Sequence, residues 1–196
     1  MLRRMNRMRR ALIAVMIMML ASVAFAAPEE VPLGAHKVGF DLNTMDNYTI
    51  RVYEPVVGIE FEIEPERNNT LSQYSFDIAF EDGSVISTSL IEWSRFMDAT
   101  FIEGVMLQRF MYECYGYRNI TGAYLDIDGK QGYLMTAVGG PTSIWGESTF
   151  SAWYWLDKVD LSNGVVSYGR NKVSISGNNV TSEVMGSFLG TVKVGR

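Results

Sequence analysis

The sequence predicts an α+β fold in which hairpins build antiparallel β-sheet around one long central helix, followed by a short C-terminal helix. Three observations predict this fold. Apolar and acidic residues alternate in "GIEFEIEPE", Asp-Gly dipeptides separate runs with strand composition, and "FIEGVMLQRFMYECYG" carries helix signals. A period of two is typical of a half-buried strand, whereas caps and length favour a helix. A mostly-β sandwich is the alternative.

The first predicted strands are "YTIRVYEP", which Pro55 ends, and "GIEFEIEPE". The second strand places three apolar side chains on one face, Ile59, Phe61 and Ile63. Its other face carries three acids, Glu60, Glu62 and Glu64. A row of like charges supplies solubility and discourages edge pairing, so we expect a solvated face. A calcium ion or a cationic partner is the alternative use of these acids.

Two Asp-Gly dipeptides predict hairpin turns. A two-residue turn at Asp82-Gly83 would place Phe80 opposite Val85 and Ile78 opposite Ser87. The second dipeptide, Asp128-Gly129, lies in "YLDIDGKQGYLMT", which also resembles the start of a calcium loop.

A calcium loop that begins at Asp126 would need a glycine at Gln131 and a glutamate at Ala137, and it has neither. The sequence therefore favours a hairpin that pairs Tyr124 with Tyr133.

Two helices are predicted. Thr100 and Glu103 form a capping box for the long helix, and Gly116 suits its C-terminal end. Apolar residues surround most of this helix, so we expect it to be covered on more than one side. The second helix is "NVTSEVMGSFLG", with Asn179 as cap and Gly190 as stop, leading into a short strand "TVKV".

The strand "STFSAWYWLDK" is apolar on both faces. Trp153 and Trp155 share one face, and with Trp145 they are the candidate ligand contacts, as a stacking platform for sugars. The alternative, which the residue types favour, is a central strand covered on both sides. The following segment, "VDLSNGVVSYGRNKVSISG", is turn-rich with short strand-like runs.

The N-terminal end has the pattern of a secretory signal peptide over residues 1–26: five arginines, an apolar run and the small-residue pattern Ala24-Phe25-Ala26. An uncleaved anchor is the alternative, although the apolar run is short for a bilayer. Residues 27–47 are expected to form an irregular arm that leads into a single α+β domain over residues 48–196. We therefore expect a secreted or extracytoplasmic protein that is soluble after cleavage.

The charge of the chain bears on its partners. The leader would carry five of the 17 basic residues and none of the 22 acids, so the mature chain has a net charge of −10. Such a surface repels phosphate backbones and anionic lipid, so we expect no nucleic-acid partner and no membrane partner after cleavage.

One cysteine, Cys114, is present, so internal disulfides cannot stabilise the domain. We expect Cys114 to be a small buried apolar residue, with an intermolecular disulfide or a reactive thiol as the alternative. Four N-x-[ST] sequons begin at Asn47, Asn68, Asn119 and Asn179 and would matter if the host glycosylates exported proteins.

The residue types restrict the chemistry. His36 is the single histidine and lies in the expected arm, which disfavours a Ser-His or Cys-His catalytic arrangement. One histidine and one cysteine cannot fill a zinc site without carboxylates, and the chain has no phosphate-binding glycine loop. The sequence therefore predicts no cofactor and no metal. A glycan hydrolase with paired carboxylates stays open, because such enzymes need two acids beside a sugar.

The order of hairpins, helix and C-terminal helix–strand, with "DIDGKQGYLMT" and "SEVMGSFLGTVKV", resembles small exported α+β proteins of the PsbP/Mog1-like sandwich type. The resemblance covers residues 48–194 as an order of elements. It implies an antiparallel sheet packed with helices and a binding or assembly role. It carries over no functional residue.

Three functional hypotheses follow. The first is an exported, non-enzymatic binding or assembly domain with an unknown protein or glycan partner, contacted through the Trp153/Trp155 face. The second is the carboxylate-dependent glycan hydrolase. The third is a structural component of the cell envelope, for which self-association without a ligand would be the mark.

Overall fold

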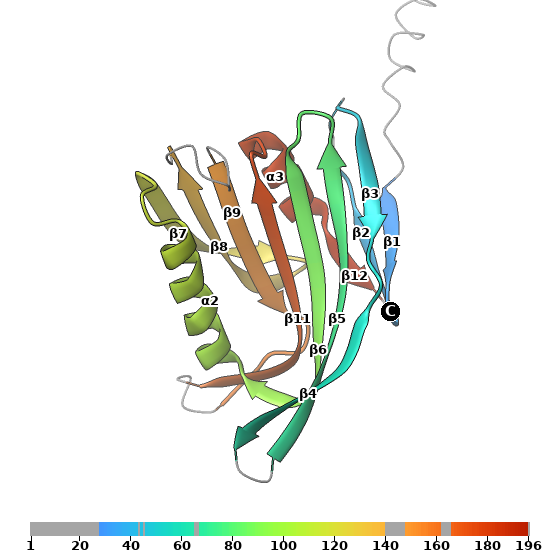
Figure 1. Cartoon of the computed structure of the whole chain (residues 1–196), viewed down its shortest axis with the longest axis vertical. Helices are drawn as coiled ribbons and strands as arrows, with labels where there is room; N and C mark the ends of the chain where they lie inside the picture. The colour runs from blue at the N-terminus through green and yellow to red at the C-terminus, as the bar shows by residue number, and fades with distance from the viewer. Residues whose placement is uncertain are drawn as a thin grey trace, which may run out of the picture.

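A computed structural model describes residues 28–42, 44, 46–64, 67–139, 148–161 and 166–195, and of residues 61–64, 67 and 68 the backbone alone. These residues form mostly antiparallel β-sheet with two helices (Figure 1). The prediction of an α+β fold with antiparallel sheet is confirmed at this level. The expected signal peptide, residues 1–26, lies outside the described residues.

The elements follow one another along the chain. The first strands are β1 (Glu29–Leu33), β2 (His36–Phe40), β3 (Tyr48–Val52), β4 (Val56–Glu64), β5 (Arg67–Phe80) and β6 (Val85–Asp98). Helix α2 (Ala99–Glu113) precedes β7 (Asn119–Ile127), β8 (Lys130–Val138), β9 (Ser148–Trp155), β10 (Val159–Asp160) and β11 (Ser167–Asn178). Helix α3 (Ser182–Thr191) and β12 (Lys193–Gly195) end the described chain.

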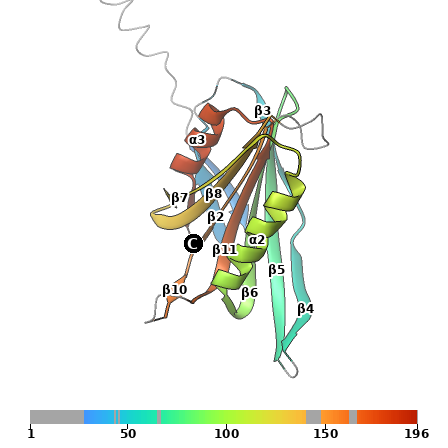
Figure 2. The ribbon, with the colours of Figure 1, turned by 90° about the vertical axis from the view of Figure 1, so that its left-hand side faces the viewer.

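The strands form a large and a small antiparallel sheet. The described strands of the large sheet have the order β3-β5-β6-β11-β9-β8-β7, with β4 on β5 and β10 on β11. The small sheet has the order β1-β2-β12. Figures 1 and 2 show that the small sheet and α3 lie on one face of the large sheet, whereas α2 lies on the other. The central strands β9 and β11 are therefore covered on both faces.

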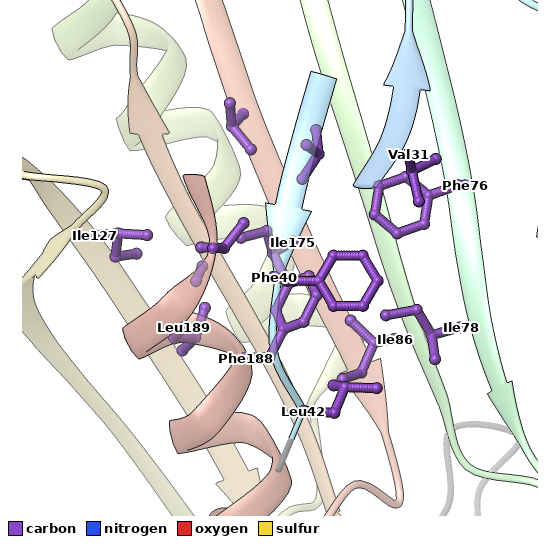
Figure 3. Packing of buried hydrophobic residues seen from close by; sticks show 14 of the residues in the cluster. Val31, Phe40, Leu42, Phe76, Ile78, Ile86, Ile127, Ile175, Phe188 and Leu189 are labelled. Carbon is purple, nitrogen blue, oxygen red and sulfur yellow. The ribbon is translucent and has the colours of Figure 1, made fainter. Parts of the chain in front are cut away.

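The main hydrophobic core lies between the large sheet, the small sheet and α3 (Figure 3). Phe40 from β2 stacks on Phe76 from β5 at 5.8 Å between ring centroids, and Phe188 from α3 contacts Phe40 at 5.0 Å. All three rings are fully buried. Burying an aromatic or large aliphatic side chain contributes about 1.5 to 3 kcal/mol, so these residues hold the layers together.

The N-terminal segment is not the irregular arm that the sequence suggested. Residues 29–40 form the β1–β2 hairpin, whose buried residues are Val31, Leu33, Val38 and Phe40. Strand β2 pairs with β12, which places Val38 opposite Val194. The prolines and glycines of this segment obscured its short alternation, and its partner strand is supplied from the other end of the chain.

The two Asp-Gly turns differ in their outcome. At Asp128-Gly129 both residues have positive φ and Tyr124 pairs with Tyr133, so the predicted two-residue hairpin is confirmed. At Asp82-Gly83 the predicted register is wrong by one residue, because the N–H of Phe80 donates to the backbone oxygen of Ser84 across a three-residue loop and Ile78 lies opposite Ile86. The Asp82 carboxylate accepts hydrogen bonds from the backbone N–H and the hydroxyl of Ser84, which favours this longer loop.

The expectation of one long central helix is not confirmed. Helix α2 has 15 residues, of which Ala99 and Phe110 are buried, and it lies on the surface of the large sheet. Its outer apolar side chains include Phe101, Met111 and Tyr112, which are exposed, so no described residue covers the second side of the helix.

The predicted helix caps are also corrected. Asp98, rather than Thr100 with Glu103, caps α2 by accepting a hydrogen bond from the N–H of Phe101. The helix ends at Glu113, with Cys114 as the C-cap, before Gly116. Thr181 rather than Asn179 caps α3, which then continues one residue past Gly190.

Strand β4 has the predicted strand conformation, but its expected burial is wrong where the side chains are described. Ile59 is exposed, because β4 pairs with β5 at the edge of the large sheet. Glu60 is exposed as expected. Phe61, Ile63, Glu62 and Glu64 have side chains outside the described residues.

Candidate functional site

The face of the large sheet beneath α2 carries a lane of hydroxyl side chains. Alternation along β11 places Lys172, Ser174, Ser176 and Asn178 on this face. Ser174 lies opposite Ser89 of β6, and Ser89 lies opposite Ser75 of β5. The hydroxyl oxygens of Ser75 and Ser89 are 3.0 Å apart, which confirms that these side chains share one face. The centre of this face is therefore polar, with Lys172 buried and Ser75, Ser89 and Ser174 partly exposed.

A groove of about 420 Å³ lies between this lane and α2, and we call it the α2 groove. Its volume falls within the range of small-molecule sites. The sheet contributes polar side chains, Gln73, Ser89, Thr149, Ser151, Lys172, Ser174, Ser176 and Asn178. Helix α2 and the residue after it contribute Met106, Arg109, Phe110, Glu113 and Cys114, and Ile91 of β6 adds an apolar surface. The groove thus combines many hydrogen-bonding groups with apolar walls.

Lys172 is the unusual residue of this groove, because it is 4 % exposed. Its Nζ donates to the thioether Sδ of Met106 at 2.8 Å and lies 5.8 Å from the ring centroid of Trp93. Thioether sulfur is a weak acceptor. Among the described residues, Lys172 forms no ion pair with a carboxylate. A buried ammonium therefore lines the groove without a counter-ion from the described protein.

The nearby charged residues are already engaged. Oε1 of Glu103 accepts hydrogen bonds from Nε1 of Trp155 at 2.9 Å and from Nζ of Lys158 at 3.2 Å. Nε of Arg109 donates to Oε1 of Glu113 at 2.6 Å. Neither Glu103 nor Glu113 therefore pairs directly with Lys172, and Glu103 acts on its charge only at longer range.

Burial lowers the pKa of Lys172 to about 8, because the ammonium loses its hydration. The attraction of Glu103 opposes this change, and the repulsion from Arg109 adds to it. A perturbed lysine in a concave site is typical of a functional residue, because unpaired buried charge destabilises a fold. We therefore take the α2 groove as the candidate site.

The predicted tryptophan platform is not exposed. Trp153 and Trp155 are each 2 % exposed, so neither can stack on a ligand in solution. Trp153 packs beneath α2 with Phe110, Cys114 and Met135, and Trp155 stacks on Trp93 at 5.4 Å. The alternative, a central strand covered on both sides, describes β9 correctly. Trp145 lies outside the described residues.

His36 lies in β2, with its Nε2 at 3.3 Å from Oε1 of Glu92. Both line a second hollow of about 500 Å³ with Arg170 and Asn171. Nε of Arg170 donates to the backbone oxygen of Trp93 at 3.3 Å, so the charged groups of this hollow already have protein partners. For that reason the α2 groove is the stronger candidate.

The remaining predicted residues are placed as follows. Cys114 is buried and unpaired, and burial, with a contribution from Glu113, raises its pKa to about 11, so its thiol is protonated at neutral pH. This matches the expected small buried apolar residue. The sequon residues Asn47, Asn119 and Asn179 are exposed, and the side chain of Asn68 lies outside the described residues.

Sequence reasoning missed Lys172. The alternation in "RNKVSISGN" places it on the polar face of a strand, and such a face is usually solvated. The available signal was the excess of serines on the same face as Lys172, together with a partly apolar helix that must pack somewhere. Neither signal identifies the strand that the helix covers.

The described residues contain no group of three or more histidine, cysteine, aspartate or glutamate side chains that could hold a metal ion. No helix within them is long and apolar enough to cross a membrane. Comparisons with protein-family models, with curated proteins and with solved structures found no match, so the resemblance to PsbP/Mog1-like proteins stays a prediction.

Proposed function

We propose that this protein is an extracytoplasmic binding domain whose α2 groove takes a small polyhydroxylated organic anion, such as an acidic sugar. The observation that carries the proposal is the ammonium of Lys172, which is buried beside a groove and has no carboxylate partner among the described residues. The signal-peptide pattern of residues 1–26 supports the location.

The anionic part of the ligand follows from charge. A buried ammonium without a counter-ion destabilises the folded protein, and a carboxylate brought by a ligand would compensate it. Hydrogen bonds to charged groups contribute about 1.5 to 3 kcal/mol each, which corresponds to roughly a ten- to 150-fold change in affinity. The carboxylate would therefore supply much of the binding free energy.

The polyhydroxylated part follows from the lining. The hydroxyls of Ser151, Ser174 and Ser176 form no hydrogen bond with another described residue, so they can donate to or accept from a ligand. Gln73 and Asn178 add amide groups to the lining, where Gln73 donates to Ser75 and Ser89 and Asn178 accepts from Thr149. Apolar surface from Ile91, Met106 and Phe110 suits the carbon face of a sugar ring.

The hydrolase hypothesis finds less support in this geometry. Glu113 is the one carboxylate among the described residues that line the α2 groove. Glu92 is likewise the one carboxylate among those that line the second hollow. Glu103 and Glu113 are ten residues apart on α2, about 15 Å along the helix axis. Glycosidase carboxylates lie about 5 to 10 Å apart.

The proposal predicts selective binding of acidic sugars. Isothermal titration calorimetry at pH 7 with glucuronate and with glucose is expected to show binding of glucuronate that is at least about tenfold tighter, because glucose lacks the carboxylate. A Lys172→Met variant is expected to lose this preference.

Lys158→Met is the matched control, because Lys158 is a partly buried lysine that pairs with Glu103 and does not line the groove. This variant is expected to keep the preference for glucuronate. Equal affinities of the wild-type protein and Lys172→Met for glucuronate would overturn the proposal, as would the absence of binding in both.

A further inference from the structure

We infer that Lys172 forms a reversible imine with a small aldehyde or 2-oxo acid that enters the α2 groove. The inference rests on the proposed function, because the carbonyl compound must occupy the same groove. It adds a covalent step to binding and names a second class of ligand.

The geometry supplies what the step needs. Lys172 lines the groove, and its Nζ donates to a thioether, which is readily displaced as a weak acceptor. No carboxylate among the described residues is paired with the ammonium and holds it protonated. The hydroxyl of Ser174, two residues away on the same strand face, can hydrogen-bond to a carbonyl oxygen or to the water that leaves.

The step is balanced without an oxidant or a reductant. The ammonium of Lys172 loses a proton to solvent, and the nitrogen lone pair attacks the carbonyl carbon to form a C–N bond. The nitrogen passes a proton to the former carbonyl oxygen, which becomes the hydroxyl of a neutral carbinolamine. This hydroxyl takes up a proton from solvent, the C–O bond breaks as the nitrogen lone pair forms the C=N bond, and water leaves, so that the protonated imine remains. Hydrolysis by the reverse sequence releases the carbonyl compound and the lysine.

The protonation state favours Lys172 over other lysines. Because burial lowers its pKa to about 8, about one tenth of this amine is neutral at pH 7. For an ordinary lysine, with a pKa near 10.4, the neutral fraction at pH 7 is below about one part in a thousand. Desolvated lysines of this kind are the amines that form Schiff bases in proteins.

The other lysines of the chain serve as internal controls. Lys37 is exposed and pairs with Glu30 at 3.3 Å, and Lys158 pairs with Glu103 at 3.2 Å. Lys130 is partly exposed and Lys193 is exposed. None of these four lines the α2 groove.

The test is reductive trapping of the full chain with pyruvate and cyanoborohydride at pH 7, with lactate as the matched compound that lacks the carbonyl. An adduct blocks trypsin at Lys172, so the modified peptide spans residues 171–193. We expect modification at Lys172 at an initial rate at least about tenfold above the mean of the other lysines, because of its larger neutral fraction. Excess glucuronate is expected to slow it, and lactate is expected to give no adduct.

The outcomes separate this inference from the proposed function. Even modification of all lysines, or none at Lys172, while glucuronate still binds, would overturn the imine and leave the groove as a binding site. No adduct at Lys172 together with no glucuronate binding would overturn both. Lys158→Met is expected to give the same Lys172 adduct as the wild-type protein, and its loss in this variant would contradict the role given to the groove.

Discussion

A Lys172→Met variant is expected to be more stable than the wild-type protein at pH 7, by about 1 to 3 kcal/mol. Methionine has a similar linear shape and brings no charge into the space between Met106 and Trp93. The removed ammonium is 4 % exposed and has no carboxylate partner among the described residues. Urea denaturation of both proteins measures the difference.

The same pair of proteins is expected to show a defined pH dependence. The pKa of Lys172 is about 8 in the folded state, below its ordinary value of 10.5. Between these two pH values the unfolded chain binds more protons than the folded protein, so the wild-type protein gains stability as pH rises. This gain is absent below pH 8 and complete above pH 10.5. The advantage of the variant should therefore shrink by up to about 3 kcal/mol between pH 7 and pH 10.5.

Two outcomes would contradict this account of Lys172. One is a Lys172→Met variant that is less stable at pH 7, which would mean that the ammonium has a strong partner. The other is a stability difference that does not change with pH, which would mean that the pKa of Lys172 is ordinary. Lys158→Met is the control, because it removes a lysine that, unlike Lys172, has a carboxylate partner, Glu103.

Phe110→Ala is expected to lower the free energy of unfolding by about 3 to 5 kcal/mol. Phe110 is 5 % exposed and anchors α2 on the large sheet through contacts with a cluster that includes Cys114, Met135 and Trp153. Because α2 forms one wall of the groove, the variant should also bind glucuronate more weakly. Chemical denaturation and calorimetry measure the two effects.

Phe101→Ala is the matched control on the same helix, because Phe101 is 68 % exposed. Its effect on the free energy of unfolding is expected to lie within about 0.5 kcal/mol. Similar losses for the two variants would contradict the placement of α2.

Local signals in the sequence predicted the parts of the fold that depend on neighbouring residues. The Asp128-Gly129 turn sets the pairing of Tyr124 with Tyr133 because both residues of the turn need positive φ. The small sheet depends on the pairing of Val38 with Val194, which lie far apart in the sequence. No local pattern predicts that contact, so the sequence predicts an irregular arm where residues 29–40 form a hairpin.

The site was missed for a related reason. Period-two alternation places Lys172 on a polar strand face, and the sequence cannot show that α2 covers that face. The aromatic residues of β9 gave the opposite error. The sequence suggests Trp153 and Trp155 as an exposed platform for sugars. In the structure β9 lies between β8 and β11, and both side chains are buried. The burial of both classes of residue is set by the packing of distant elements.

The central claim is that the α2 groove binds an anionic ligand at Lys172. NMR of the lysine side-chain CεH₂ groups during a glucuronate titration tests this claim most directly. The signal that is missing from the spectrum of Lys172→Met assigns the Lys172 resonance. The account predicts a saturable change at the Lys172 signal, with little change at Lys37, Lys130, Lys158 and Lys193. An unchanged Lys172 signal up to saturating concentrations, or equal small changes at all lysines, would contradict it.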